Sequence, residues 1–129
     1  MYKKKEIAVI ALYDDQGRIL LQDRQGISKA GEEWGFFGGG LETGETPEQA
    51  LIREIKEELD FDLKEFDFLA KYKVRLPATD LYNEIWLFIG PLGNNLRHIT
   101  QKEGRGMRLF SCDEARRLMM NSADMDIIC

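Results

Sequence analysis

The sequence predicts an α/β fold in which a mixed β-sheet lies between α-helices. Segments with strand composition occur before and after one uninterrupted helical segment, Pro47 to Leu59, and a second helical segment follows Ser111. Helices separated by groups of strands are expected to cover a shared sheet. Periodicity leaves the strand order open. With 129 residues, the chain is expected to form one domain, residues 1–129.

The first strands are expected to form a hairpin. Glu6 to Tyr13 and Arg18 to Asp23 have the pattern of strands, and Asp14 to Gly17 between them has the composition of a turn. Arg24 to Glu33 has loop composition. The aromatic residues from Trp34 to Phe37 then indicate a short strand that leads into a glycine loop.

The central helix has a clear start. Thr46 is suited to the N-cap, Pro47 to the first helical position, and Gln49 completes a capping box with Thr46. Asp60 follows the helix, where a left-handed residue is common and Asp is tolerated. One arc of about 100° carries the apolar residues expected to face the core, namely Leu51, Ile52, Ile55 and Leu59.

The later elements are expected to form a second hairpin, a loop, a strand and a helix. Phe66 to Leu76 and Leu81 to Ile89 are rich in aromatic and branched residues, and Pro77 to Asp80 connects them. Gly90 to Gly106 has loop composition, and Met107 to Phe110 indicates a short strand.

The last helix is expected to begin after Ser111, which forms a second capping box with Glu114. Its apolar face would consist of Ala115, Leu118 and Met119.

The composition excludes several classes of protein. Hydrophobic residues make up 43% and charged residues 32% of the chain, which is typical of a globular protein. The sequence has no apolar run of the roughly 18 residues that a membrane span needs. The net charge of −5 argues against binding to duplex nucleic acid, which requires a basic face. We therefore expect a small-molecule partner, with neither a membrane nor duplex nucleic acid.

The possible metal ligands are oxygen atoms. Cys112 and Cys129 lack the spacing of a metal site and are expected to be free thiols in a reducing cytoplasm, and His98 is a single histidine. An oxygen ligand set favours Mg²⁺ or Mn²⁺.

The central helix concentrates negative charge. Glu54, Glu57 and Glu58 project together, and like charges at this spacing cost a helix roughly 0.2–0.5 kcal/mol per pair. An ion pair between Arg53 and Glu57 would leave a solvated acidic face that binds no ligand. Lys56 points away from the group, so one arginine faces three glutamates, and a divalent cation would offset this imbalance of charge. Spacing alone does not separate these two interpretations.

The glycines before the helix extend the acidic group into a motif. Gly38, Gly39, Gly40 and Gly44 let the backbone approach a ligand closely, and Glu42 and Glu45 bring two more carboxylates to the helix. The segment from Gly39 to Phe61 resembles the Nudix box of the Nudix (MutT-like) hydrolases. The match departs from the motif at its last glycine, which is Asp60 here, and otherwise rests on Gly39, Glu45, Arg53, Glu54, Glu57 and Glu58.

The resemblance implies an α/β/α sandwich and metal-dependent hydrolysis of a nucleoside diphosphate linked to another group. Phosphoryl transfer depends on positioning and charge neutralisation, which divalent ions held by carboxylates supply. Carried over by position, the metal ligands are Glu54, Glu57 and Glu58, with a backbone carbonyl of Gly39 or Gly40. Family members are often dimers, so a homodimer is one expected state.

The resemblance also assigns supporting roles. An ion pair between Arg53 and Glu45 would fasten the loop to the helix. The general base could be Glu54, Glu57 or Glu103, and Glu103 could also be a metal ligand or pair with a neighbouring cation. The residues expected at the substrate are Gly38, Gly40 and Trp34. Trp34 would either stack on a base there or pack in the core.

The substrate is less defined. The short chain resembles the nucleoside-triphosphate pyrophosphohydrolases, including those that clear oxidised nucleotides, and these release a monophosphate and pyrophosphate. Pro77 lies where ADP-ribose hydrolases carry a marker proline, so ADP-ribose, nucleotide sugars and dinucleoside polyphosphates are alternatives. A non-catalytic nucleotide sensor is a second class, and the intact glutamates argue against it. A calcium buffer would need an EF-hand loop, which is lacking.

Overall fold

The computed structural model describes residues 3–23, 34–75, 80–93, 106–118 and 128. Strand β1 (Lys3–Tyr13) is the centre of its mixed sheet. It pairs in parallel with β6 (Leu81–Pro91) along its whole length. Its other edge is shared by β4 (Phe37–Gly40) and β2 (Ile19–Asp23), both antiparallel to it. The strand order, which the sequence left open, is therefore β3-β2-β1-β6-β5, with β4 on β1 and β7 on β2.

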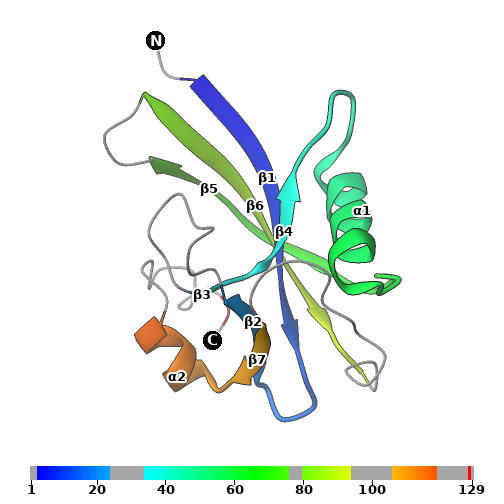
Figure 1. The fold of residues 1–129 in the computed structure, drawn as a ribbon, viewed down its shortest axis with the longest axis vertical. Helices are drawn as coiled ribbons and strands as arrows, with labels where there is room; N and C mark the ends of the chain where they lie inside the picture. The colour runs from blue at the N-terminus through cyan, green and yellow to red at the C-terminus, as the bar shows by residue number, and fades with distance from the viewer. Residues whose placement is uncertain (1–2, 24–33, 76–79, 94–105, 119–127, 129) are drawn as a thin grey trace.

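The outer strands complete the sheet (Figure 1). Strand β5 (Asp67–Arg75) is antiparallel to β6, which confirms the predicted second hairpin pairing. Strands β3 (Trp34–Gly35) and β7 (Met107–Phe110) both pair with β2. The first hairpin is confirmed by the pairing of β1 with β2.

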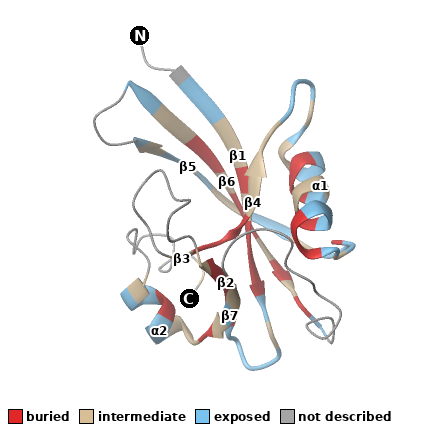
Figure 2. Cartoon of the chain, in the orientation of Figure 1, coloured by how far each residue is buried: buried red, intermediate tan, exposed pale blue. Residues whose placement is uncertain are grey.

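The two helices cover opposite faces of the sheet, so the predicted α/β/α arrangement is confirmed (Figure 1). Helix α1 (Pro47–Leu59) packs on β4 and β1 and buries its apolar side in the larger core, which also contains Phe37 and Phe88. Helix α2 (Cys112–Leu118) contributes Ala115 to a second core with Phe110. Figure 2 shows the buried side of α1 turned toward the sheet.

The ends of α1 are set by local sequence, as predicted. The Thr46 side chain accepts a hydrogen bond from the backbone N–H of Gln49, and the Gln49 side chain accepts one from the Thr46 N–H. Asp60 ends the helix in the left-handed conformation, with φ 53° and ψ 41°. Lys56 lies 3.1 Å from Asp60 and 3.2 Å from Asp62, away from the glutamate group as expected.

Two local predictions are wrong. The segment Gly38–Gly40 is strand rather than loop, because its backbone pairs with Val9, Ala8 and Ile7 of β1. Ile52 is 41% exposed, whereas Ala50 is fully buried. Ile52 lies at the edge of the predicted apolar arc, and the contact of α1 with the glycine strand moves the buried side toward Ala50.

The expectation of free thiols is also wrong, because Cys112 is disulfide-bonded. The chain has one other cysteine, Cys129, which lies outside the described residues. Spacing in the sequence could not reveal this bond, since it depends on where the helix places Cys112. Within the described ranges, none of the helices has the length and apolar character needed to cross a membrane.

Candidate active site

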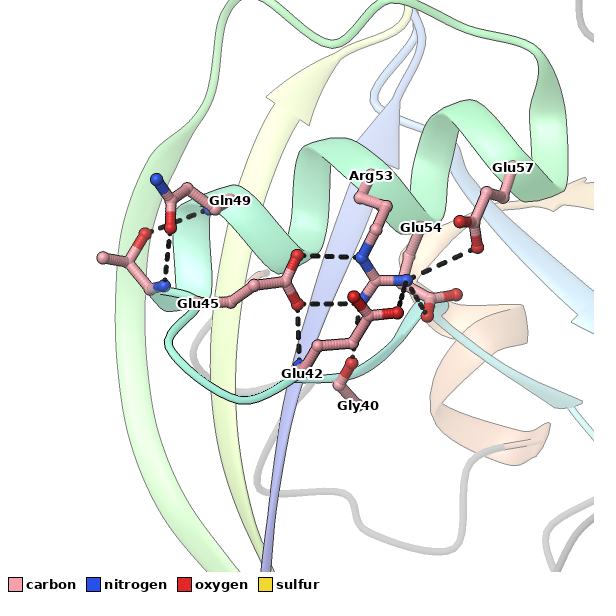
Figure 3. Close-up of polar contacts among 8 residues, drawn as sticks. Gly40, Glu42, Glu45, Gln49, Arg53, Glu54 and Glu57 are labelled. Atoms are coloured by element: carbon pink, nitrogen blue, oxygen red, sulfur yellow. Dashed lines mark hydrogen bonds and ion pairs between the residues drawn. The ribbon is translucent and has the colours of Figure 1, made fainter.

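The acidic side of α1 is arranged around the guanidinium group of Arg53 (Figure 3). This group contacts four carboxylates and one backbone carbonyl. Arg53 lies on the side of the helix that faces the end of β4, so it meets residues from the strand, from the following loop and from the helix itself. The contacts are with Gly40, Glu42, Glu45, Glu54 and Glu57.

Arg53 and Glu45 form the predicted ion pair between helix and loop. Nε of Arg53 lies 2.8 Å from Oε2 of Glu45, and Nη2 lies 2.9 Å from Oε1. The Arg53 hydrogen bonds and the backbone N–H of Glu42 lower the pKa of Glu45 to about 2. The same pair, together with Glu54, raises the pKa of Arg53 above its ordinary value. Both groups are therefore charged at neutral pH.

Glu54 and Glu57 approach the same nitrogen of Arg53. Oε1 of Glu54 lies 2.9 Å from Nη1, and Oε2 of Glu57 lies 3.4 Å from it. Glu42 reaches the same nitrogen at 3.7 Å. Carboxylates from one helix and one loop thus converge on a single cationic atom.

The glycine strand lies directly against one of these carboxylates. A β-carbon at Gly39 would lie 2.4 Å from Cδ of Glu54 and 2.6 Å from its Oε2. The absence of a side chain at Gly39 therefore makes room for the Glu54 carboxylate. Gly38 is required for the fold. A β-carbon there would lie 2.0 Å from the backbone oxygen of Ala8, and φ is 147°.

The three motif glutamates differ strongly in exposure. Glu58 is 8% exposed as a residue and its Oε2 is buried, whereas the side chains of Glu54 and Glu57 are 18% and 59% exposed. They therefore extend from the core to the solvent instead of sharing one exposed face. Across the described ranges, no three His, Cys, Asp or Glu side chains already surround one point at metal-ligand spacing.

The residues nevertheless fit a divalent cation in their chemistry. Mg²⁺ and Mn²⁺ prefer carboxylate and carbonyl oxygens. Glu54 and Glu57 already share one cationic atom, the Nη1 of Arg53, and Glu54 lies against the Gly39 backbone. A divalent cation can bind next to Glu54 and Glu57 if their carboxylates turn from Nη1 of Arg53 toward the ion.

Trp34 and Gly40 are the remaining residues predicted for the site that the structure describes. Trp34 packs edge-on against Phe110, with ring centroids 5.0 Å apart, as part of the second core. Glu103 and Pro77 lie outside the described residues. The Nη2 of Arg53 donates to the carbonyl of Gly40 at 2.9 Å, so that carbonyl already has one partner.

Sequence reasoning assigned no role to Lys5, which the structure places beside Gly40. Lys5 is far from the motif in sequence, and its position follows from the pairing of β1 with β4. The sequence has three consecutive lysines, Lys3 to Lys5, and this tract alone does not indicate which lysine faces the glycine strand.

Comparison with known proteins identifies the family. The family model for the NUDIX domain matches residues 3–129 of this chain. The chain belongs to the Nudix family. The predicted resemblance is therefore confirmed, and the departure at Asp60 does not remove the chain from the family.

Relatives of this Nudix chain include curated enzymes. It is 32% identical over 85 residues to the 8-oxo-dGTP diphosphatase of Escherichia coli, and the matched segment covers 66% of each protein. It is 40% identical over 67 residues to the 8-oxo-dGTP diphosphatase of Proteus vulgaris, covering 52% of this chain and 60% of that enzyme. The matches thus span less than two thirds of these relatives' lengths.

Solved structures share the Nudix fold. The E. coli ORF135 protein superposes with a TM-score of 0.69 at 25% identity, covering 98% of this chain and 87% of that one. A MutT protein from Methanosarcina mazei gives a TM-score of 0.80 at 16% identity, covering 98% and 91% of the two chains. The second likeness concerns the fold alone.

Proposed function

We propose that this Nudix protein is a metal-dependent pyrophosphohydrolase acting on a nucleoside diphosphate linked to another group. The substrate is a nucleoside triphosphate, standard or oxidised, and the products are a nucleoside monophosphate and pyrophosphate. The observation that carries this proposal is the approach of Glu54 and Glu57 to one cationic atom beside Gly39. The names of the E. coli and P. vulgaris relatives support a triphosphate substrate.

We assign the roles of the carboxylates from their places in the Nudix motif. Glu54, Glu57 and Glu58 would hold Mg²⁺ or Mn²⁺, with the Gly39 carbonyl and Glu103 as further ligands. When bound, such an ion would neutralise charge on the phosphate chain and would lower the pKa of an attacking water. Glu54, Glu57 or Glu103 accepts the proton of that water as general base.

The remaining residues orient the site. Arg53 holds the side chains of Glu54 and Glu57 near one another and, through Glu45, fixes the loop that follows β4. Gly38, Gly40 and Trp34 contact the substrate in this proposal. The chain acts as one domain. Its assembly as a homodimer and its cytoplasmic location stay predictions, and the disulfide-bonded Cys112 argues against the thiol-based reason for the latter.

The test is product release across a nucleotide panel. Pyrophosphate and phosphate are measured with and without Mg²⁺ or Mn²⁺, using standard and oxidised nucleoside triphosphates, ADP-ribose, nucleotide sugars and dinucleoside polyphosphates. Metal-dependent pyrophosphate release from triphosphates is expected. Sugar phosphate from ADP-ribose would replace the substrate assignment, and nucleotide binding without any turnover would indicate a sensor.

A further inference from the structure

Lys5 lies beside the last glycine of β4. A β-carbon at Gly40 would lie 3.1 Å from Cε of Lys5 and 3.9 Å from its Nζ. Gly40 pairs with Ile7 of β1, and Lys5 is two residues away on the same face of the sheet. The lysine side chain thus lies directly beside the position that a β-carbon at Gly40 would take.

Lys5 differs from its neighbour Lys4 in its ionic contacts. Nζ of Lys4 lies 3.3 Å from Glu6 and 3.1 Å from the buried Glu84, and these pairs lie on the opposite face of the strand. Lys5 is exposed, and no carboxylate in the described part of the chain pairs with it. Its ammonium group can therefore bind an anion without breaking an existing ion pair.

The position of Lys5 connects it to the acidic site. Gly40, the residue beside Lys5, accepts a hydrogen bond from Arg53 through its carbonyl at 2.9 Å. The preceding residue, Gly39, lies against Glu54. Successive residues of a strand face opposite sides, so β4 has the glutamates on one side and Lys5 on the other.

The charges explain what Lys5 contributes. Arg53 is shared among four carboxylates, so it has little positive charge to offer an anion. A nucleotide that spans the end of β4 brings several negative charges into an acidic site. Lysine ammonium groups bind phosphate oxygens through charge-assisted hydrogen bonds.

We propose that Lys5 binds the phosphate chain of the substrate where that chain passes Gly40. This inference rests on the proposed function, because it takes a polyphosphate to be the substrate. Lys5 lies across β4 from the glutamates and takes no part in proton transfer. Its loss should therefore raise KM and leave kcat nearly unchanged.

The test compares Lys5→Met, Lys5→Arg and the control Lys4→Met, which removes the same charge from the other face of β1. Lys5→Met should raise the KM for the triphosphate about tenfold, because one charged hydrogen bond is lost. A tenfold change corresponds to about 1.4 kcal/mol. Lys5→Arg should restore most of the affinity, and Lys4→Met should keep the wild-type KM. The wild-type KM should also rise more steeply with salt than that of Lys5→Met.

Binding of inorganic tripolyphosphate, measured by calorimetry in the presence of Mg²⁺, separates this inference from the proposed function. Weaker binding to Lys5→Met than to wild type supports the role of Lys5, even if no nucleotide is hydrolysed. Equal binding by the two proteins, or an equal loss in Lys4→Met, would overturn it. A wild-type protein that hydrolyses no nucleotide refutes the proposed function alone.

Discussion

Arg53 and Glu45 are joined at two points, with Nε 2.8 Å from Oε2 and Nη2 2.9 Å from Oε1. Glu45 stands just before the N-cap of α1, and Arg53 lies about two turns into the helix. The pair therefore fixes the loop after β4 to the helix that carries the glutamates. Several expected properties of the protein follow from this link.

The first prediction concerns acid stability. The pKa of Glu45 falls from an ordinary value of 4.5 to about 2 in the folded protein. A lowered pKa stabilises the fold above pH 4.5, and this contribution is lost as the pH falls toward 2. Thermal unfolding of wild type and Glu45→Gln between about pH 6 and pH 2 should therefore show a difference in Tm that shrinks with acidification. A constant difference would contradict the assignment.

The second prediction concerns Glu57. Glu57→Gln should reduce kcat/KM by more than ~100-fold, because even partners outside a metal's ligand shell cost about 10–100-fold when removed. The side chain is 59% exposed and its contact with Arg53 is long, at 3.4 Å. The free energy of unfolding should therefore change by less than about 0.5 kcal/mol. Glu48→Gln, an exposed change on the first turn of α1, is the control and should retain activity. Near-normal turnover of Glu57→Gln with excess metal would refute the ligand assignment.

The third prediction concerns Gly39. Gly39→Ala places a methyl group 2.4 Å from Cδ of Glu54, so the carboxylate must move. Because Glu54 is a flexible side chain, the fold should lose less than about 1 kcal/mol, whereas activity should fall by roughly 10–100-fold. Denaturant unfolding and steady-state kinetics measure the two effects. Full activity in Gly39→Ala would show that the position of Glu54 is unimportant.

The fourth prediction concerns Gly38, one residue earlier. Gly38→Ala meets the backbone oxygen of Ala8 at 2.0 Å and a φ of 147°. Neither can relax through a side chain, so the free energy of unfolding should fall by roughly 1–3 kcal/mol or more. Chemical denaturation compared with Gly39→Ala checks this, and Gly38→Ala should be the less stable protein. The opposite order would contradict the assigned roles.

The fifth prediction concerns the end of α1. Asp60→Gly should raise the free energy of unfolding by roughly 0.5–1 kcal/mol, since glycine adopts the left-handed conformation without strain. The lost pair with Lys56 is exposed and contributes little, and Lys56 keeps Asp62 at 3.2 Å. Asp62→Ala removes the other pair without relieving strain and should change stability only slightly. Urea denaturation of the three proteins distinguishes strain from charge.

Features set by neighbouring residues could be predicted from the sequence. The capping box of Thr46 and Gln49 defines the start of α1, and the left-handed Asp60 defines its end, because these contacts span only a few residues. The pair of Arg53 with Glu45 was implied by the resemblance to the Nudix motif. The Nudix motif indicated the family and implied the α/β/α sandwich, and the order of helical and strand segments predicted a mixed sheet between helices.

Only the tertiary structure decided which surfaces meet. The pairing of β1 with β4 makes Gly38–Gly40 a strand and places Lys5 over Gly40, although Lys5 is 35 residues from Gly40 in the chain. The packing of α1 on that strand leaves Ile52 exposed, and it buries Glu58 while Glu57 stays exposed. Periodicity gives the angle of each side chain around its own helix or strand. The neighbour that each side chain meets depends on strand register and helix packing, which arise from contacts distant in sequence.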